Sequence, residues 1–305
     1  MIIGLSIAQP AFLSSHNIFN VLTQSAIFGI MALGLTFVII SKGIDLSVGS
    51  VLAFSGVIAS SLGQSAEATS KYFPNLPIMP VLVPILAALI VGALCGGLSG
   101  FLIAKTRIPA FIATLGMMTV ARGMALIYTD GKPVSTLIPS FTAIGGKVFG
   151  VIPIPVIIYF VMIIISTILL SNTRFGKNVY AIGGNINAAE VSGVNVKRNL
   201  IMIYAYSGLL AGLAAVVFAG RVGSVHPGAA TGYELTAIAS TTIGGTSHSG
   251  GIGTIWGAFV GALVLAVLRN GLTLLGVDAY WQQVVEGVII VVAVIIDMRK
   301  NAKKD

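Results

Sequence analysis

The chain has 305 residues with a mean hydropathy of +1.00, and only 9% of its residues are charged. Soluble domains carry about 25% charged residues, so this composition excludes an ordinary soluble protein. The formal net charge of +8 therefore indicates basic loops beside a membrane rather than nucleic-acid binding, which we exclude. The single cysteine, Cys95, excludes an intrachain disulfide and a cysteine metal cluster.

Apolar runs of membrane length recur along the chain and indicate an all-α polytopic membrane protein. The runs do not alternate between apolar and polar residues, so a transmembrane β-barrel is excluded. The first apolar stretch ends at Pro10 and is too short to cross a bilayer. We expect it to be either the remainder of a first helix that starts upstream or a short interfacial segment.

Further spans are predicted after this stretch. In chain order they are Val21–Ile40, Val51–Leu62, Val81–Ala104, Phe111–Tyr128, Val151–Leu170, Leu200–Gly220, Glu234–Gly244, Trp256–Leu268 and Trp281–Ile296. The segment Glu234–Gly244 is short and only moderately apolar, but the alternation of sides requires it to count as a crossing. With a short or truncated first helix included, residues 1–305 form a single transmembrane domain of about ten helices.

Asp45 and Ser47 lie in SKGIDLSVGS (41–50), just before the second predicted span. One interpretation is a helix N-cap, where a carboxylate or hydroxyl accepts from exposed amides at the positive end of a helix. The other is a gate or a lining of the translocation path. The position of these short polar side chains between Gly43 and an apolar run favours the cap.

Arg122 lies near the middle of the span Phe111–Tyr128, and Glu286 lies within the last span. An unpaired charge at membrane depth is costly, so each side chain should face protein or a wet cavity. Two interpretations stay open. Either residue lines the path, or Arg122 is bound by a carboxylate such as Glu286 or Asp130, or by backbone carbonyls. Thr114, from the same span as Arg122, is a further path candidate.

The longest polar interruption is Ser171–Asn199, which carries four basic residues: Arg174, Lys177, Lys197 and Arg198. Basic loops between spans are typically cytoplasmic. When this loop and the basic tail 299–305 are placed inside, eleven of the 17 Lys and Arg residues fall on the inner side and six on the outer side. This count predicts a cytoplasmic C-terminus.

A short helix is predicted within this loop, over Ile186–Ser192 between two glycine breaks. Asn185 or Asn187 is expected to cap its start, and Ala188, Ala189 and Val191 form a small apolar face. The residues assigned to the segment are Gly184, Asn185, Asn187, Ala188, Ala189, Glu190, Val191, Ser192 and Gly193. The alternatives from the residues alone are a contact with a partner and an ordinary solvated loop.

The chain lacks a phosphate-binding loop, an H-E-x-x-H motif and a G-x-S-x-G motif. The three histidines, His16, His226 and His248, are far apart in sequence, so neither a metal site nor an intramembrane enzyme is expected. A self-sufficient secondary transporter or channel for a small polar solute stays open as the alternative function. Such proteins usually carry more carboxylates at membrane depth than Asp45, Glu234 and Glu286.

Five blocks of sequence carry a family resemblance. They are ALGLTFVIISKGIDLSVGSVLAFSG (32–56), FIATLGMMTVARGMALIYTDGKPV (111–134), TRFGKNVYAIGGNINAAEVSGVNV (173–196), TGYELTAIASTTIGGTSHSGGIGT (231–254) and NGLTLLGVDAYWQ (270–282). In this order they resemble the membrane permeases of bacterial ABC importers for ribose and related monosaccharides. The chain departs from that family before NIFNVL (17–22), where members have a complete first helix.

The resemblance implies a type II-like ABC importer permease in the bacterial inner membrane, with galactose or xylose as alternatives to ribose. It implies a homodimer surrounded by membrane lipid, above a cytoplasmic ABC ATPase that holds ATP and Mg. A periplasmic or lipid-anchored sugar-binding protein docks on the other side. The chain itself is then a transport subunit rather than an enzyme, it has no cofactor, and sugar affinity resides in the binding protein.

The resemblance also assigns roles within the chain. The loop 171–199 becomes the segment that couples to the ATPase, and we expect Gly183→Pro or Glu190→Arg to uncouple transport without affecting folding. The outer basic residues are candidates for docking acidic residues of the binding protein: Lys71, Lys132, Lys147 and Arg221. For any one of them, solvated loop charge is the simpler interpretation.

Overall fold

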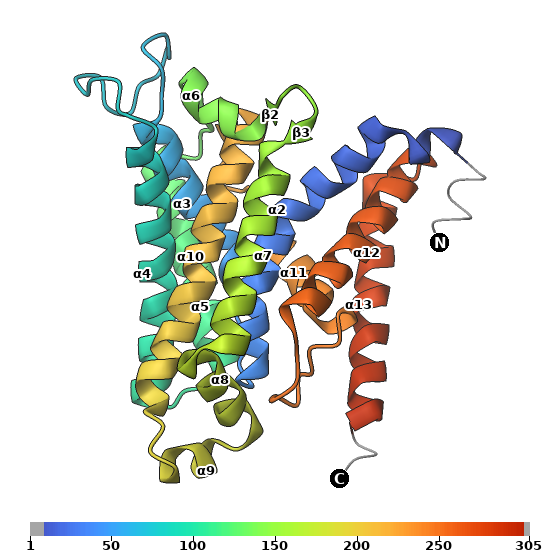
Figure 1. Cartoon of the computed structure of the whole chain (residues 1–305). Helices are drawn as coiled ribbons and strands as arrows, with labels where there is room; N and C mark the ends of the chain where they lie inside the picture. The colour runs from blue at the N-terminus through green and yellow to red at the C-terminus, as the bar shows by residue number, and fades with distance from the viewer. Residues whose placement is uncertain (1–8, 302–305) are drawn as a thin grey trace.

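The structure, a computed structural model, describes residues 9–301 and consists mainly of α-helices (Figure 1). The long helices are α2 (Ser15–Ile40), α4 (Leu82–Thr106), α5 (Ala110–Thr129), α7 (Ile154–Asn172), α10 (Val196–Val222), α12 (Ile255–Leu274) and α13 (Ala279–Asn301). The shorter helices are η1 (Pro10–Leu13), α3 (Val48–Leu62), α6 (Pro139–Thr142), η2 (Ala143–Gly145), α8 (Arg174–Gly184), α9 (Ile186–Val191) and α11 (Tyr233–Ile243).

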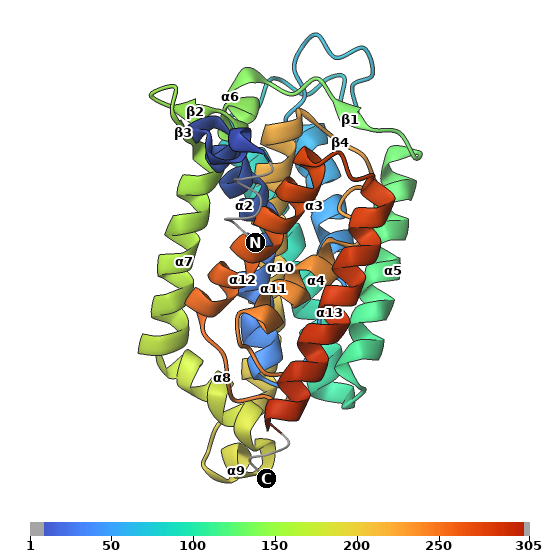
Figure 2. The same ribbon diagram turned by 90° about the vertical axis from the view of Figure 1, so that its right-hand side faces the viewer.

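The two ends of the bundle differ in structure. One end, which we call the α6 end, carries residues 63–81, α6 and two antiparallel strand pairs (top of Figures 1 and 2). The pairs join β1 (Val134–Ser135) with β4 (Ser224–Val225), and β2 (Lys147–Val148) with β3 (Ile152–Pro153). The opposite end, the α9 end, carries α8, α9 and the turn between α11 and α12 (Figure 1).

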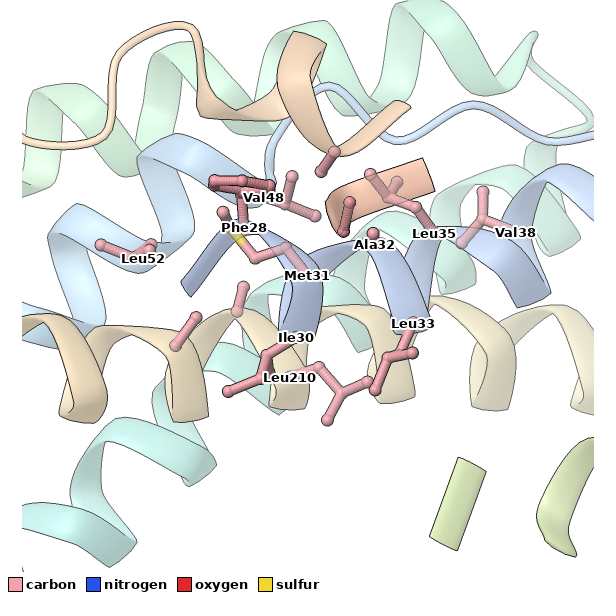
Figure 3. Close-up of a cluster of buried hydrophobic side chains, with 14 of the residues drawn as sticks. Phe28, Ile30, Met31, Ala32, Leu33, Leu35, Val38, Val48, Leu52 and Leu210 are labelled. Atoms are coloured by element: carbon pink, nitrogen blue, oxygen red, sulfur yellow. The ribbon is translucent and has the colours of Figure 1, made fainter. Parts of the chain in front are cut away.

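α2 is the central helix of the fold. Every residue from Ser25 to Ile40 is buried, and α2 contacts α7, α8, α10, α11 and α12. A helix whose whole circumference is apolar is stable only when protein or lipid surrounds it, which is why this span occupies the core. Figure 3 shows Phe28 and Met31 of α2 beside Val48 of α3, with Leu210 of α10 on the opposite side of α2.

α4 and α10 pack closely against each other through small residues. A Cβ built on Gly96 would overlap the carbonyl oxygen of Tyr204, and one on Gly92 would overlap that of Gly208. Missing side chains let membrane helices approach closely and gain dispersion contacts. The glycines of the predicted span Val81–Ala104 therefore have the packing role expected for them.

The all-α polytopic class is confirmed. Within residues 9–301, six helices are long and apolar enough to cross a membrane, namely α2, α4, α5, α7, α10 and α12. Two shorter apolar helices accompany them, α3 and the stretch Ala279–Ile295 of α13. The first crossing expected before Pro10 falls mostly on residues 1–8, which lie outside the described residues.

The crossing expected at Glu234–Gly244 is not a complete helical span. α11 has 11 residues, or about 16 Å at the helical rise of 1.5 Å per residue, which is too short for a bilayer. The chain leaves the α6 end at Val225 of β4 and continues through residues 226–232 without helix. α11 follows, and after it Gly244 packs against Gly257 in the first turn of α12. A non-helical segment and a short helix together make this crossing.

Candidate functional site

The loop Ser171–Asn199 folds into two short helices at the α9 end (Figure 1). The hydroxyl of Thr173 accepts a hydrogen bond from the Gly176 amide at 3.2 Å and caps α8. Oδ1 of Asn185 accepts from the Ala188 amide at 3.0 Å and caps α9. Of the two caps proposed from sequence, Asn185 is therefore confirmed, and the short helix is present with its end at Val191.

The apolar side chains of α9 divide between the interior and the surface. Ala189 is buried with Ile182 and Val196 and fastens α9 to α8 and α10. Ile186 and Val191 are 45% and 90% exposed. The residues expected to form one apolar face, Ala188, Ala189 and Val191, are thus divided. The exposed apolar face consists of Ile186, Ala188 and Val191. The exposed residues of the segment are Gly184, Asn185, Asn187, Ala188, Glu190, Val191, Ser192 and Gly193.

α8 was not predicted from sequence, where this stretch was assigned to a polar loop. Phe175, Val179 and Ile182 recur at spacings of four and three residues, which is the signal of an amphipathic helix. Val179 and Ile182 are buried, and Phe175 packs against the core. The helix is only three turns long and contains Arg174 and Lys177, so its apolar spacing repeats too few times to stand out from a polar loop.

α8 is attached to three other parts of the chain. The Tyr180 hydroxyl donates to the Gly253 carbonyl at 2.7 Å, and the Lys42 ammonium lies 3.4 Å from the Gly184 carbonyl oxygen. Gly183 packs directly on the carbonyl of Ile40, which also accepts from the Gly251 amide at 2.8 Å. α8, the end of α2 and the turn before α12 therefore form one connected contact.

Asp45 and Ser47 lie in a buried segment between α2 and α3. Oδ1 of Asp45 accepts from the Ser47 amide at 2.9 Å and from the Ser47 hydroxyl at 2.6 Å, and Oδ2 accepts from Ser207 of α10 at 2.9 Å. Ser47 stands at the N-cap position of α3 but makes no capping bond with its side chain. The cap expected at Ser47 is wrong, because the hydroxyl is used by Asp45.

Thr114 supports the same buried segment from α5. Its hydroxyl is 2.9 Å from the carbonyl oxygen of Ala110, one turn earlier, and 3.2 Å from that of Ile44. Three of the five path candidates, Asp45, Ser47 and Thr114, therefore meet at the entry to α3. All three are buried, and their polar atoms are satisfied within the protein.

Arg122 is held by backbone carbonyls. Its Nη1 atom donates to Pro227 at 2.6 Å and to Ala229 at 2.8 Å, both in the non-helical part of the broken crossing. The suggested ion pair with Glu286 or Asp130 is wrong, and the alternative of a carbonyl cluster is confirmed. An arginine is suited to this place because irregular backbone at membrane depth has carbonyls that lack a helical partner.

The starts of α3 and α11 meet beside this arginine. A Cβ on Gly49, in the first turn of α3, would overlap Glu234 Oε2 and the carbonyl oxygen of Ala230. Glu234, in the first turn of α11, accepts from the Gly232 amide at 3.2 Å. Helix starts carry partial positive charge, so the carboxylate of Glu234 is favourably placed between them.

Glu286 belongs to a separate polar cluster between α11, α12 and α13. Oε1 accepts from the Thr236 hydroxyl at 2.6 Å, and Oε2 accepts from Arg269 Nε at 3.1 Å and Nη2 at 2.5 Å. The predicted span Trp256–Leu268 ends just before Arg269, but α12 continues to Leu274, and Arg269 forms a largely buried ion pair with Glu286. The pair borders a cavity of about 590 Å³, which is also lined by residues from the start of α11 and the first half of α13, among them Tyr233, Leu235, Gln283 and Gly287.

The four docking candidates all belong to the α6 end. Lys71 is half-buried, whereas Lys132, Lys147 and Arg221 are exposed. Lys132 donates to Asp130 at 3.0 Å, and this bond raises the pKa of its ammonium. Its charge is therefore already paired within the loop. Lys147 lies on β2, two residues after Gly145, which packs on the backbone of Arg221.

Comparison with known proteins places the chain among permeases. The family model described as "Branched-chain amino acid transport system / permease component" matches residues 17–294. The chain is 43% identical over 303 residues to the ribose import permease protein RbsC of Escherichia coli K12, covering 97% of this chain and 90% of that protein. No solved structure matches the chain significantly.

Two further relatives extend the range of named sugars. The ribose import permease protein RbsC of Bacillus subtilis 168 is 44% identical over 304 residues, which cover 99% of this chain and 91% of that protein. The galactose/methyl galactoside import permease protein MglC of Salmonella typhimurium LT2 is 41% identical over 303 residues, which cover 97% and 90%. The similarity thus spans nearly the full length of each relative.

Proposed function

Because the chain belongs to the family of branched-chain amino acid transport system permease components, we propose that it is the membrane-spanning permease of an ATP-driven monosaccharide importer. The observation that carries the proposal is the near full-length identity to permeases named for ribose and for galactose. The identities to the two groups are close, so the assigned substrate is a monosaccharide of the ribose or galactose type. Permease subunits of ABC importers are non-catalytic and carry no cofactor of their own.

ATP hydrolysis in this proposal takes place on a partner ABC ATPase, which binds ATP and Mg. The segment α8–α9 is the surface that meets this ATPase. Its exposed Ile186 and Val191 offer apolar contacts, and Glu190 adds a charge beside them. The attachment of α8 to Ile40 and Gly253 gives the segment a mechanical connection to α2 and to the turn before α12.

The α9 end is cytoplasmic in this proposal, and with it the last turn of α13, which lies at the same end of the bundle (Figure 1). The inner set of eleven basic residues supports this orientation through the positive-inside tendency. The α6 end then faces the periplasm, where a sugar-binding protein docks. Lys147 and Arg221 are better docking candidates than Lys132, whose charge is neutralised by Asp130.

A second copy of the chain completes the transporter in this proposal. Asp45, Ser47, Thr114 and Arg122 are engaged in holding the irregular segments before α3 and α11. We assign them to positioning those segments. Glu286 is the path candidate that borders a cavity.

The proposal is tested by purification with a mild detergent from native membranes, followed by reconstitution. We expect an ABC ATPase to copurify with the chain, and we expect uptake of ribose or galactose by proteoliposomes to require that ATPase, ATP and a sugar-binding protein. Uptake by the purified chain alone, driven by an ion gradient, would overturn the proposal in favour of a secondary transporter.

A further inference from the structure

The cavity beside the Arg269–Glu286 pair has the properties of a ligand site. It has a volume of about 590 Å³ and lies between the start of α11, α12 and the first half of α13. Figure 2 shows these three helices next to one another. Ligand pockets in proteins generally measure about 300–1,000 Å³. The cavity is therefore large enough for a small organic solute.

The charges that border the cavity cancel. Among the described residues that line it, Arg269 and Glu286 are the only charged ones, and they are bonded to each other. The other carboxylate oxygen of Glu286 accepts a hydrogen bond from the Thr236 hydroxyl. The lining has no net charge to attract an ionic solute. A neutral polar solute needs no such attraction to bind. The electrostatics therefore favour a neutral ligand.

The other residues that line the cavity include both polar and apolar side chains. Tyr233 and Gln283 contribute a hydroxyl and an amide that make no hydrogen bond in the described part of the chain, while Leu235 and Ile290 contribute hydrocarbon. Monosaccharides have the same division, with hydroxyl groups around the ring and C–H groups on its faces. Amide and hydroxyl groups exchange hydrogen bonds with sugar hydroxyls in both directions.

The position of the cavity fits a solute on its way through the membrane. Ala279, at the start of α13, borders the cavity near the α6 end, where we place the docked binding protein. Tyr233, at the start of α11, borders it at the point where the helical part of the broken crossing begins. The cavity thus extends from the α6 end toward the interior of the bundle.

We propose that this cavity is a low-affinity site for a neutral monosaccharide, occupied after release from the binding protein. This site rests on the proposed function. In it, Tyr233 and Gln283 contact the sugar, and Arg269, whose guanidinium carbon lies 5.9 Å from the centre of the Tyr233 ring, positions that ring. Low affinity follows from the small number of unsatisfied polar groups. It also suits transport, because a tightly held solute would leave slowly.

Gly287 offers a way to fill the cavity without disturbing the fold. It lines the cavity, and a Cβ built on it meets no atom within 4 Å. Gly287→Phe should therefore place its ring in the cavity rather than against the backbone. Val284, on the same helix, is exposed and does not border the cavity, so Val284→Phe is the matched control.

The test measures binding and transport on the permease–ATPase complex reconstituted in lipid nanodiscs and proteoliposomes. Saturation-transfer NMR with millimolar D-ribose and, separately, D-galactose reports contact between sugar and protein in the absence of the binding protein. We expect a signal for at least one sugar with the wild type and Val284→Phe, and none with Gly287→Phe. Gln283→Ala should weaken binding about fivefold, as for one lost hydrogen bond.

Uptake separates this inference from the proposed function. We expect Gly287→Phe to block sugar uptake while complex assembly and basal ATP hydrolysis persist. If the wild type transports sugar but transfers no saturation to either sugar, or if Gly287→Phe binds sugar as the wild type does, the site is refuted and the permease function stands. If the wild-type complex transports no sugar at all, the proposed function itself fails.

Discussion

Tyr180 of α8 and Gly253, two residues before α12, are joined by a hydrogen bond of 2.7 Å between the tyrosine hydroxyl and the glycine carbonyl. This bond crosses from the proposed ATPase-contacting segment to the turn that connects α11 with α12. It is the shortest of the polar contacts that we describe between α8 and that turn. A movement of α8 has here a direct route to the helices that border the polar cavity.

Tyr180→Phe removes this bond and keeps the ring. Because one net hydrogen bond is worth about 1 kcal/mol, we expect roughly a fivefold loss in sugar transported per ATP hydrolysed, with folding retained. Tyr128→Phe is the matched control, since the Tyr128 hydroxyl lies 2.6 Å from that of Ser61 in a region distant from α8. Equal ratios for both variants in proteoliposomes would contradict a coupling role for Tyr180.

Gly183 and Gly184 are neighbours with opposite surroundings. A Cβ on Gly183 would overlap the carbonyl oxygen of Ile40, whereas one on Gly184 meets nothing within 4 Å. We expect Gly183→Ala to destabilise the protein by about 1–3 kcal/mol, as overpacking does, and Gly184→Ala to be close to neutral. Thermal unfolding in detergent measures the difference, and equal midpoints would contradict the contact.

The same contact revises the effect expected of Gly183→Pro. A proline at this position adds a ring where no Cβ fits, so it should lower the yield of folded protein as well as transport. Glu190→Arg is the cleaner probe of coupling, because Glu190 is exposed on α9. We expect this variant to fold normally and to lose association with the ATPase in copurification.

Gly96 and Gly97 of α4 form a second pair. Gly96 packs on the backbone of Tyr204, while the nearest atom to a Cβ on Gly97 is the Cβ of Ala205 at an ordinary 3.7 Å. Gly96→Ala should cost about 1–3 kcal/mol by pushing α4 from α10. Gly97→Ala should be neutral or slightly stabilising, because alanine favours helix by about 1 kcal/mol. A reversed order of unfolding midpoints would contradict the packing of α4 on α10.

The Arg269–Glu286 pair predicts a non-additive pair of substitutions. Arg269→Met or Glu286→Leu alone leaves a buried charge without its partner, which typically costs about 3–5 kcal/mol. The double variant removes both charges and should recover most of this loss. The double-mutant cycle is measured by thermal unfolding of the purified protein. Strictly additive losses would show that the two side chains do not interact.

His248 predicts a pH dependence of the turn before α12. It lies 2.8 Å from the Thr242 hydroxyl and beside Asp297, and burial lowers the pKa of its imidazole below the ordinary value of 6.5, although the negative charge of Asp297 opposes this. The unfolded chain then binds this proton more readily than the folded one. Stability is complete above pH 6.5 and falls as the pH drops through that value.

His248→Gln isolates this contribution, because glutamine still hydrogen-bonds but does not titrate in this range. We expect the difference in unfolding midpoint between the wild type and His248→Gln to change between pH 7.5 and 5.5, with the wild type losing stability relative to the variant. A difference that stays constant over this range would contradict burial of a neutral imidazole.

Local features were predictable where the physical cause is local. The helix over Ile186–Val191 follows from Asn185 three residues before Ala188, because a capping bond joins residues that are adjacent in the chain. α8 was missed although its apolar spacing was present. Its stability comes from burial against Ile40 and Gly253, and these residues are distant in sequence.

The choice of partners for charged residues was not predictable. The sequence shows that Arg122 needs a partner at membrane depth, yet Glu286, Asp130 and backbone carbonyls were all available. The structure selects Pro227 and Ala229, more than a hundred positions away in the chain. The predicted span ends at Leu268 because a charged residue follows it, whereas the bond of Arg269 to Glu286 allows the helix to continue to Leu274.

The sequence alone determined the membrane class, the family resemblance, the asymmetry of basic loops and the capped helix at Ile186. These depend on composition and on spacings of a few residues, which a chain carries before it folds. Only the tertiary structure decided that α2 is the buried centre, that the crossing at Glu234 is broken, and that Glu286 pairs with Arg269 beside a polar cavity. The reason is that burial and ion pairing depend on which distant segments come within a few ångströms, and hydropathy gives no information about that distance.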